Sequence, residues 1–279
     1  MPGQQPARHV LDAVTTAARE VLGERLAAVY ALGSLAHGGF APLVSDVDVA
    51  LVLTVTDRTT ADGIARVNQL ARTRCATDLA ERLSLFWTDA EGVRLGRGEY
   101  GRLSEVDRLD LIDAGLLLAG TDQRAGAVRP DSAGLIRESA QLAVTKFDDR
   151  YLGSLTAPAT LVAQGARAVT KAVLFPVRFL FTLRTGQIGH NADAATWYAA
   201  HGAHGALVEH ALRWRDDGIA DPDRAVALLD QHLIGVYDEF LGAFIRELPE
   251  AGVGAPELIG NLRARRKVLQ SLAGATPAT

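Results

Sequence analysis

The sequence is poor in several features that mark particular classes of protein. Its 279 residues include a single cysteine, Cys75, which excludes an intramolecular disulfide and favours a reducing compartment. The formal net charge of −4 provides no general basic field, so a nucleic acid partner is disfavoured. The first ten residues, MPGQQPARHV, lack the apolar segment of a signal peptide.

Long hydrophobic runs are also missing. The most apolar window, AVLFPVRFLFTL at 172–183, is short and is interrupted by Pro176 and Arg178, so it predicts a buried helix rather than a membrane span. Apolar residues make up 48% of the chain and charged residues 22%, as is usual for folded domains. We therefore expect a soluble, cytoplasmic protein with no membrane partner.

The pattern of elements changes along the chain. Before residue 125, helical spacing alternates with short apolar strands, predicted at 26–32, 47–53, 82–87 and 115–120, and a helix is predicted over 60–80. From about Leu135 onward we find helical periods and no convincing strand, with a helix start at Asp221-Pro222. The final GATPAT is expected to fray. We therefore expect an α+β protein, with a mixed β-sheet domain at 1–125 and an all-α helical bundle at 130–275.

The segment GSLAHGGFAPLVSDVDVALVL, residues 33–53, carries the strongest chemical signal. Alternate residues of a strand share a face, so Asp46 and Asp48 should project together, away from the buried valines between and after them. Neighbouring carboxylates repel each other unless a cation lies between them, and such oxygen pairs suit Mg²⁺. Gly33 lets the backbone approach a bulky anion, and Ser34 offers a hydroxyl and an N–H to phosphate oxygens. Together these residues predict a site for Mg²⁺ and a nucleoside triphosphate, where a nucleophile attacks phosphorus in line.

A Gly-Ser turn or an Asp-x-Asp pair alone is common on solvated protein surfaces, but their order and spacing here are specific. This arrangement resembles the nucleotidyltransferase superfamily that includes DNA polymerase β. Its fuller form looks most like the aminoglycoside adenylyltransferases. The segment TGQIGHNADAATW, residues 185–197, is similar to a stretch in the helical domain of the streptomycin/spectinomycin adenylyltransferases.

The resemblance implies a nucleotidyltransferase domain followed by a helical domain, with ATP and acceptor bound in the cleft between them. Gly33 and Ser34 would hold the triphosphate, and Asp46 and Asp48 would ligate Mg²⁺ and take part in catalysis. We add Ser45 to the expected nucleotide-binding residues. The expected reaction moves AMP, or another nucleoside monophosphate, from the triphosphate to a hydroxyl of a small molecule, an aminoglycoside-like antibiotic, and releases pyrophosphate.

Two positions depart from the family pattern. The family usually carries a third carboxylate on a neighbouring strand, and the residue on the corresponding face here is Ser84, which cannot accept a proton near neutral pH. We predict Glu81 in that catalytic role. The other candidates are Asp89, Glu91, Asp107, Asp110 and Asp113. The last three are spaced by three on one side of a helix, which by default is a solvated face.

The second departure is Asn191, where the aminoglycoside enzymes tend to carry a lysine that reaches the ATP phosphates. Lys171 is predicted to supply this charge, with Arg178 as the alternative; either side chain could instead simply extend from an apolar helix to solvent. Trp197 is predicted to line the acceptor pocket, and a position in the core is the alternative.

Two other functions remain open from the sequence. The same chemistry could act on tRNA or on a protein side chain, as in toxin-type nucleotidyltransferases. The serine at position 84 is also compatible with a catalytically silent nucleotide-binding protein with a regulatory role.

Overall fold

The computed structural model describes residues 5–96 and 98–275 of the chain. The chain forms two compact units that divide between Pro130 and Asp131. The first unit combines a sheet with helices, and the described residues of the second contain only helices and their connections. This confirms the predicted α+β class. The expected fraying at the end of the chain concerns mainly residues 276–279, which lie outside the described residues.

The first unit contains one four-stranded mixed sheet. Its strands are β1 (Leu26–Leu32), β2 (Val47–Leu53), β3 (Leu83–Asp89) and β4 (Leu116–Gly120), in the order β3-β2-β1-β4. β1 pairs antiparallel with β2 and with β4, whereas β2 and β3 are parallel. The parallel pair needs a crossover, which α3 (Thr60–Cys75) provides. All four predicted strands are present, and β1 and β2 have the predicted bounds.

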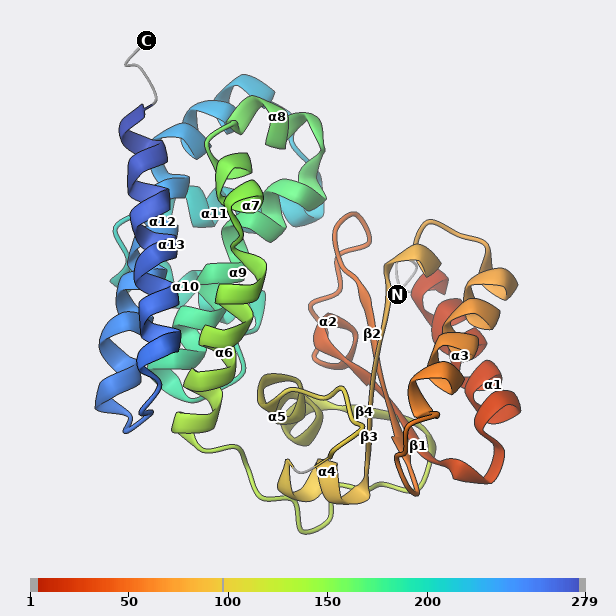
Figure 1. The fold of residues 1–279 in the computed structure, drawn as a ribbon. Helices are drawn as coiled ribbons and strands as arrows, with labels where there is room; N and C mark the ends of the chain where they lie inside the picture. The colour runs from red at the N-terminus through yellow and green to blue at the C-terminus, as the bar shows by residue number, and fades with distance from the viewer. Residues whose placement is uncertain (1–4, 97, 276–279) are drawn as a thin grey trace. The chain divides into compact units, whose positions relative to one another are not determined.

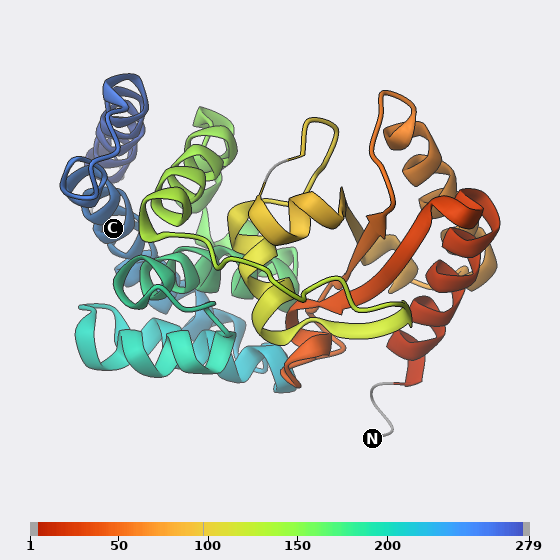
Figure 2. The same ribbon diagram turned by 90° about the horizontal axis from the view of Figure 1, so that it is seen from below.

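Helices cover both faces of this sheet (Figures 1 and 2). α1 (Gln5–Leu22) and α3 pack on the face that buries Val47, Val49 and Leu51 of β2. α4 (Ala90–Leu95) and α5 (Glu105–Ala114) pack on the other face, where Val93 and Leu111 contact alternate residues of β1 and β2. The strict alternation along β2 therefore turns Asp48 to the face that α5 covers.

The described residues of the second unit form eight helices, of which two, α7 and α8, are short. They are α6 (Ser132–Lys146), α7 (Asp149–Leu155), α8 (Pro158–Ala163), α9 (Ala166–Thr185), α10 (Asn191–His201), α11 (Gly205–Asp217), α12 (Pro222–Glu250) and α13 (Pro256–Ala275). The start of α12 is the predicted one, and the Asp221 carboxylate caps it by accepting from the backbone N–H of Arg224 at 3.0 Å.

Aromatic rings fill the core of the helical unit. Phe147 lies at the centre, with its ring centroid 5.1 Å from Tyr237 and 5.4 Å from Tyr151. The buried Tyr237 hydroxyl donates to the carbonyl of Ala172 at 2.9 Å and lies 2.6 Å from the Tyr151 hydroxyl, so its polar atom is satisfied. None of the helices in the described part of the chain combines the length and the apolar character that a bilayer crossing requires.

Candidate active site

The turn that follows β1 brings the backbone unusually close to a carboxylate of β2. β1 ends at Leu32, and the short helix α2 (Gly33–Ala36) begins at once. Gly33 has φ +59°, a conformation that side chains disfavour, and a Cβ atom added to it would lie 2.8 Å from Oδ2 of Asp48. Only glycine allows this approach, because a methyl group there would press on the Asp48 carboxylate. The backbone conformation and the nearby Asp48 carboxylate therefore explain why position 33 is a glycine.

The two aspartates of the motif follow the predicted alternation. Val47 and Val49 are fully buried, whereas Asp46 and Asp48 are half-buried. Asp48 lies within β2 and pairs in register with Leu32, the last residue of β1. Asp46 immediately precedes the strand. The motif thus holds both carboxylates at the end of the central strand pair, next to the Gly33 turn.

The loop that carries the aspartates is fixed from two sides. Ser45 is buried, and its Oγ accepts from the backbone N–H of Ala41 at 3.0 Å. Nη1 of Arg82, just before β3, donates to the carbonyl of Pro42 at 2.9 Å and reaches that of Leu43 at 3.2 Å. Ser45, which we predicted to bind nucleotide, therefore at least helps to close this loop, and its contact with a nucleotide stays a prediction.

Ser34 follows Gly33 and is half-buried. Its hydroxyl forms no side-chain hydrogen bond among the described residues, so it is available to a ligand. This placement is compatible with the predicted contact between Ser34 and a triphosphate, which stays a prediction.

The sheet register places Ser84 directly beside Asp48. β2 and β3 run parallel, and Asp48 pairs with Ser84, so the neighbouring strand carries a hydroxyl and not a carboxylate at this place. Glu81 lies in a helical turn before β3, with its side chain 69% exposed, and forms an ion pair with Arg72 at 2.9 Å. Asp89 lies beside Leu53 at the far end of the strand, where it caps α4 by accepting from the N–H of Gly92. Neither carboxylate occupies the place beside Asp48.

A carboxylate from a helix reaches the Gly33 turn instead. Asp110 of α5 is only 7% exposed, and its Oδ2 accepts from the backbone N–H of Gly33 at 2.7 Å. The expectation of a solvated face is therefore wrong for Asp110. The sequence does contain a signal, since Asp110 stands between Leu109 and Leu111, both fully buried. Asp48 and Asp110 thus meet the same glycine, one at its Cα and the other at its N–H.

Charge and donor type together define what this site can hold. The carboxylates of Asp48 on β2 and Asp110 on α5 both lie at the Gly33 turn, and Asp46 precedes Asp48 by two residues. Carboxylates gathered in this way favour a cation, and their hard oxygen atoms suit Mg²⁺ better than a softer metal. The residues present therefore fit a divalent cation that carries a polyphosphate.

The two remaining predicted residues belong to the helical unit. Lys171 is an exposed residue of α9. Trp197 on α10 is half-buried; its ring stacks on that of His201, with centroids 5.1 Å apart, and meets the edge of Phe181. Trp197 lines a pocket of the helical unit, as described below. The roles of both residues stay predictions.

The comparisons with known proteins agree with this geometry at the level of the fold. No model of a known protein family matches the sequence, and no curated protein matches it. Among solved structures, the spectinomycin adenyltransferase AAD(9) from Enterococcus faecialis, crystallised with ATP and spectinomycin, has a TM-score of 0.53 and 15% identity over 80% of this chain and 98% of that chain. The chain therefore has a nucleotidyltransferase-like fold.

Proposed function

We propose that this protein is a Mg²⁺-dependent nucleotidyltransferase that moves AMP, or another nucleoside monophosphate, from a nucleoside triphosphate to a hydroxyl group. The observation that carries the proposal is the convergence on Gly33. The Asp48 carboxylate lies against its Cα, and the Asp110 carboxylate accepts its N–H at 2.7 Å. A turn with only a structural role does not require two carboxylates beside its glycine. A metal–triphosphate site requires both a tight glycine turn and carboxylates.

The proposed roles follow from these positions. Asp46 and Asp48 would hold Mg²⁺, which when bound supplies the positive charge that stabilises the entering and leaving oxygens. The Ser34 hydroxyl would donate to a phosphate oxygen. Asp110 would act as the third carboxylate in place of Ser84, because it is the buried acidic group that meets the Gly33 turn. Glu81 is the alternative, and its exposed ion pair with Arg72 would have to open first.

We further propose that the acceptor is a small polyhydroxylated molecule of the aminoglycoside-like antibiotic class. Two observations support this class: the fold likeness to a spectinomycin adenyltransferase, and the resemblance of the segment 185–197 to the helical domain of such enzymes.

A second candidate is favoured by one observation. Ser84 beside Asp48 removes the carboxylate that the family places on the third strand. If Asp110 does not replace it, the chain would bind a nucleotide without turning it over, and would act as a regulatory protein. The two candidates differ in turnover and agree in binding.

The first experiment is titration calorimetry with a non-hydrolysable ATP analogue, with and without Mg²⁺. We expect binding that requires Mg²⁺ and is lost in the double variant Asp46→Asn/Asp48→Asn, because the amides keep the shape but remove the charge that holds the metal. Glu24→Gln is the matched control, since it removes an exposed carboxylate from the same unit. No binding to the unmodified protein, or unchanged binding in the double variant, would refute both candidates.

A second measurement separates the two candidates. Protein that binds the analogue is incubated with labelled ATP, Mg²⁺ and a panel of aminoglycoside-type acceptors. Release of pyrophosphate with a gain of one AMP on an acceptor supports the enzyme, and binding without any release supports the silent protein.

A further inference from the structure

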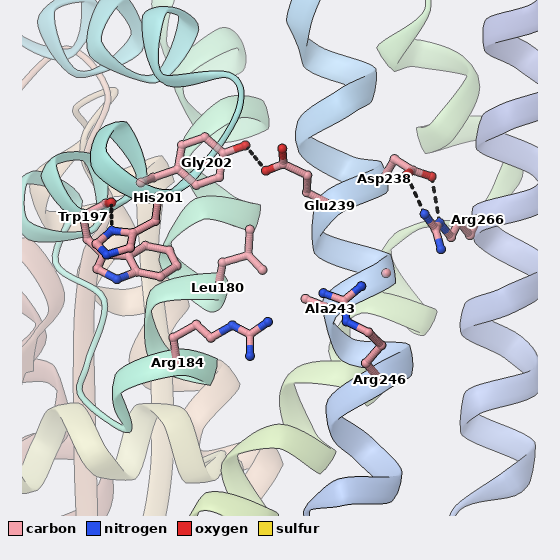
Figure 3. Close-up of a pocket in the computed structure, with 12 residues that line it drawn as sticks. Leu180, Arg184, Trp197, His201, Gly202, Asp238, Glu239, Ala243, Arg246 and Arg266 are labelled. Carbon is pink, nitrogen blue, oxygen red and sulfur yellow. Dashed lines mark hydrogen bonds and ion pairs between the residues drawn. The ribbon is translucent and has the colours of Figure 1, made fainter.

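The helical unit contains a pocket of its own. It has a volume of about 320 Å³ and lies between α9, α10, α12 and α13 (Figure 3). This volume is at the lower end of the range for small-molecule sites, so the pocket admits a compact ligand. Gly242 of α12 helps to shape its floor, because a Cβ there would lie 3.3 Å from the guanidinium carbon of Arg266.

The acidic groups of the pocket already have strong partners. Asp238 accepts two hydrogen bonds from Arg266, from Nε at 2.8 Å and from Nη2 at 2.6 Å. Glu239 accepts from the Tyr198 hydroxyl and from the backbone N–H of Ala203 at 3.2 Å. Both carboxylates are therefore turned to the wall and hydrogen-bonded there, which leaves less of their charge to attract a cation.

Two arginines remain for a ligand. Figure 3 shows the guanidinium groups of Arg184 and Arg246 extending from α9 and α12 into the same part of the pocket. Arg184 is ion-paired with Glu247, the residue that follows Arg246 on α12. Arg246 is exposed and forms no hydrogen bond or ion pair within the described part of the chain. Because Glu247 balances the charge of Arg184, the uncompensated positive charge at this end of the pocket is that of Arg246, and it favours an oxyanion.

The opposite wall is aromatic. The rings of Trp197 and His201 stack with an interplanar angle of 17°, and Nδ1 of His201 lies 2.7 Å from the carbonyl of Trp197. Since a carbonyl only accepts, this nitrogen carries the hydrogen and the imidazole is held in place. The pocket therefore offers a fixed flat apolar surface together with a pair of oxyanion donors.

We propose that this pocket binds a small aromatic carboxylate, whose ring packs beside Trp197 and whose carboxylate lies between Arg184 and Arg246. The proposal is independent of nucleotidyl transfer, because every residue that carries it belongs to the helical unit.

The test is calorimetric titration of salicylate, with benzylamine as a probe that has a similar ring and the opposite charge. No nucleotide is present. We expect salicylate to bind the unmodified protein and benzylamine not to bind. Arg246→Ala should weaken salicylate binding about tenfold, because a charge-assisted hydrogen bond is lost. Trp197→Ala should also weaken it, through loss of the flat surface.

Arg263→Ala is the matched control, because it removes an exposed arginine of α13 that does not line the pocket. It should leave the affinity unchanged. Thermal unfolding of each variant verifies that the helical unit is intact; should Arg246→Ala unfold, the titration is repeated with Arg184→Gln, which keeps a long polar side chain. The proposal is overturned if salicylate does not bind, if benzylamine binds equally well, or if the control variant loses as much affinity as the pocket variant.

Discussion

At the scale of single residues, Gly33 is the most constrained position of the candidate site. Replacing it by alanine forces a side chain into a φ of +59° and places a methyl group 2.8 Å from Oδ2 of Asp48. We expect Gly33→Ala to lower the free energy of unfolding by about 1–2 kcal/mol, the cost of a left-handed conformation. The displaced Asp48 should also abolish Mg²⁺-dependent nucleotide binding.

Denaturant unfolding and calorimetry with the ATP analogue measure these two effects. Gly38→Ala is the control, because Gly38 has φ +84° but no atom within 4 Å of its would-be Cβ. The control should show a comparable loss of stability with intact nucleotide binding. Equal binding in the two variants would contradict the role given to the contact between Gly33 and Asp48.

Asp110 can act through its hydrogen bond, its charge, or both, and two substitutions separate these effects. Asp110→Asn keeps an oxygen that accepts the Gly33 N–H, so the fold should remain and only turnover should fall. Asp110→Ala leaves that partly buried N–H without its acceptor and should cost about 1 kcal/mol of stability as well. Rates of pyrophosphate release and urea unfolding curves of both variants check this.

Glu81→Gln belongs in the same series, because Glu81 is the competing candidate. If Glu81→Gln abolishes turnover while Asp110→Asn does not, the third carboxylate is Glu81 and our assignment fails. If both variants keep the full rate, neither residue takes the proton of the acceptor.

At the scale of elements, the pair α12 and α13 is joined by an ion pair whose strength depends on pH. Hydrogen bonds from Arg266 lower the pKa of Asp238. The stabilisation is therefore fully present above the unfolded pKa of an aspartate, about 3.9, and is lost as the pH falls through the lower folded value. Asp238→Asn should be less stable than the unmodified protein near neutral pH, and the difference should vanish in strong acid.

Urea unfolding at a series of pH values measures this difference. Both side chains are about one-third exposed, at 32% and 36%, so we expect a loss of no more than about 1 kcal/mol. Asp149→Asn is the control, because Asp149 forms an ion pair with Arg265 of the same helix α13 but its side chain is 76% exposed. This substitution should change the free energy of unfolding less. A pH-independent deficit in Asp238→Asn would contradict the assignment to charge.

The elements also show what the sequence could and could not predict. β1 and β2 were predictable to the residue, because the apolar run of β1 ends at a glycine and the valine-rich run of β2 begins after an aspartate. The helix predicted to reach residue 80 ends at Cys75, since Ala76 adopts a left-handed conformation with φ 40° that no glycine announces. Local patterns encode strands well and encode such a stop poorly.

At the scale of the whole molecule, the α+β class and the carboxylates of β2 could be predicted, because both depend on neighbours in the sequence. The contact of Asp110 with Gly33 could not, because it joins residues 77 positions apart. The spacing of three between Asp107, Asp110 and Asp113 predicted a solvated helix face. The packing of α5 on the sheet buries Asp110 and overturns that prediction for this residue. The arginines of the helical pocket escaped prediction for the same reason, since they come from three separate helices.

The contact of Arg82 with the loop of residues 42–45 affects the order in which the site can form during synthesis on the ribosome. It joins the loop that carries Asp46 to a residue up to 40 positions later in the sequence. During synthesis both aspartates leave the ribosome well before Arg82, and Asp110 leaves later still. A nascent chain of about eighty residues thus contains the motif and both strands β1 and β2, but lacks the hydrogen bonds from Arg82 and Asp110. The final arrangement of the Gly33 turn and its two carboxylates should form only after β3 and α5 have emerged.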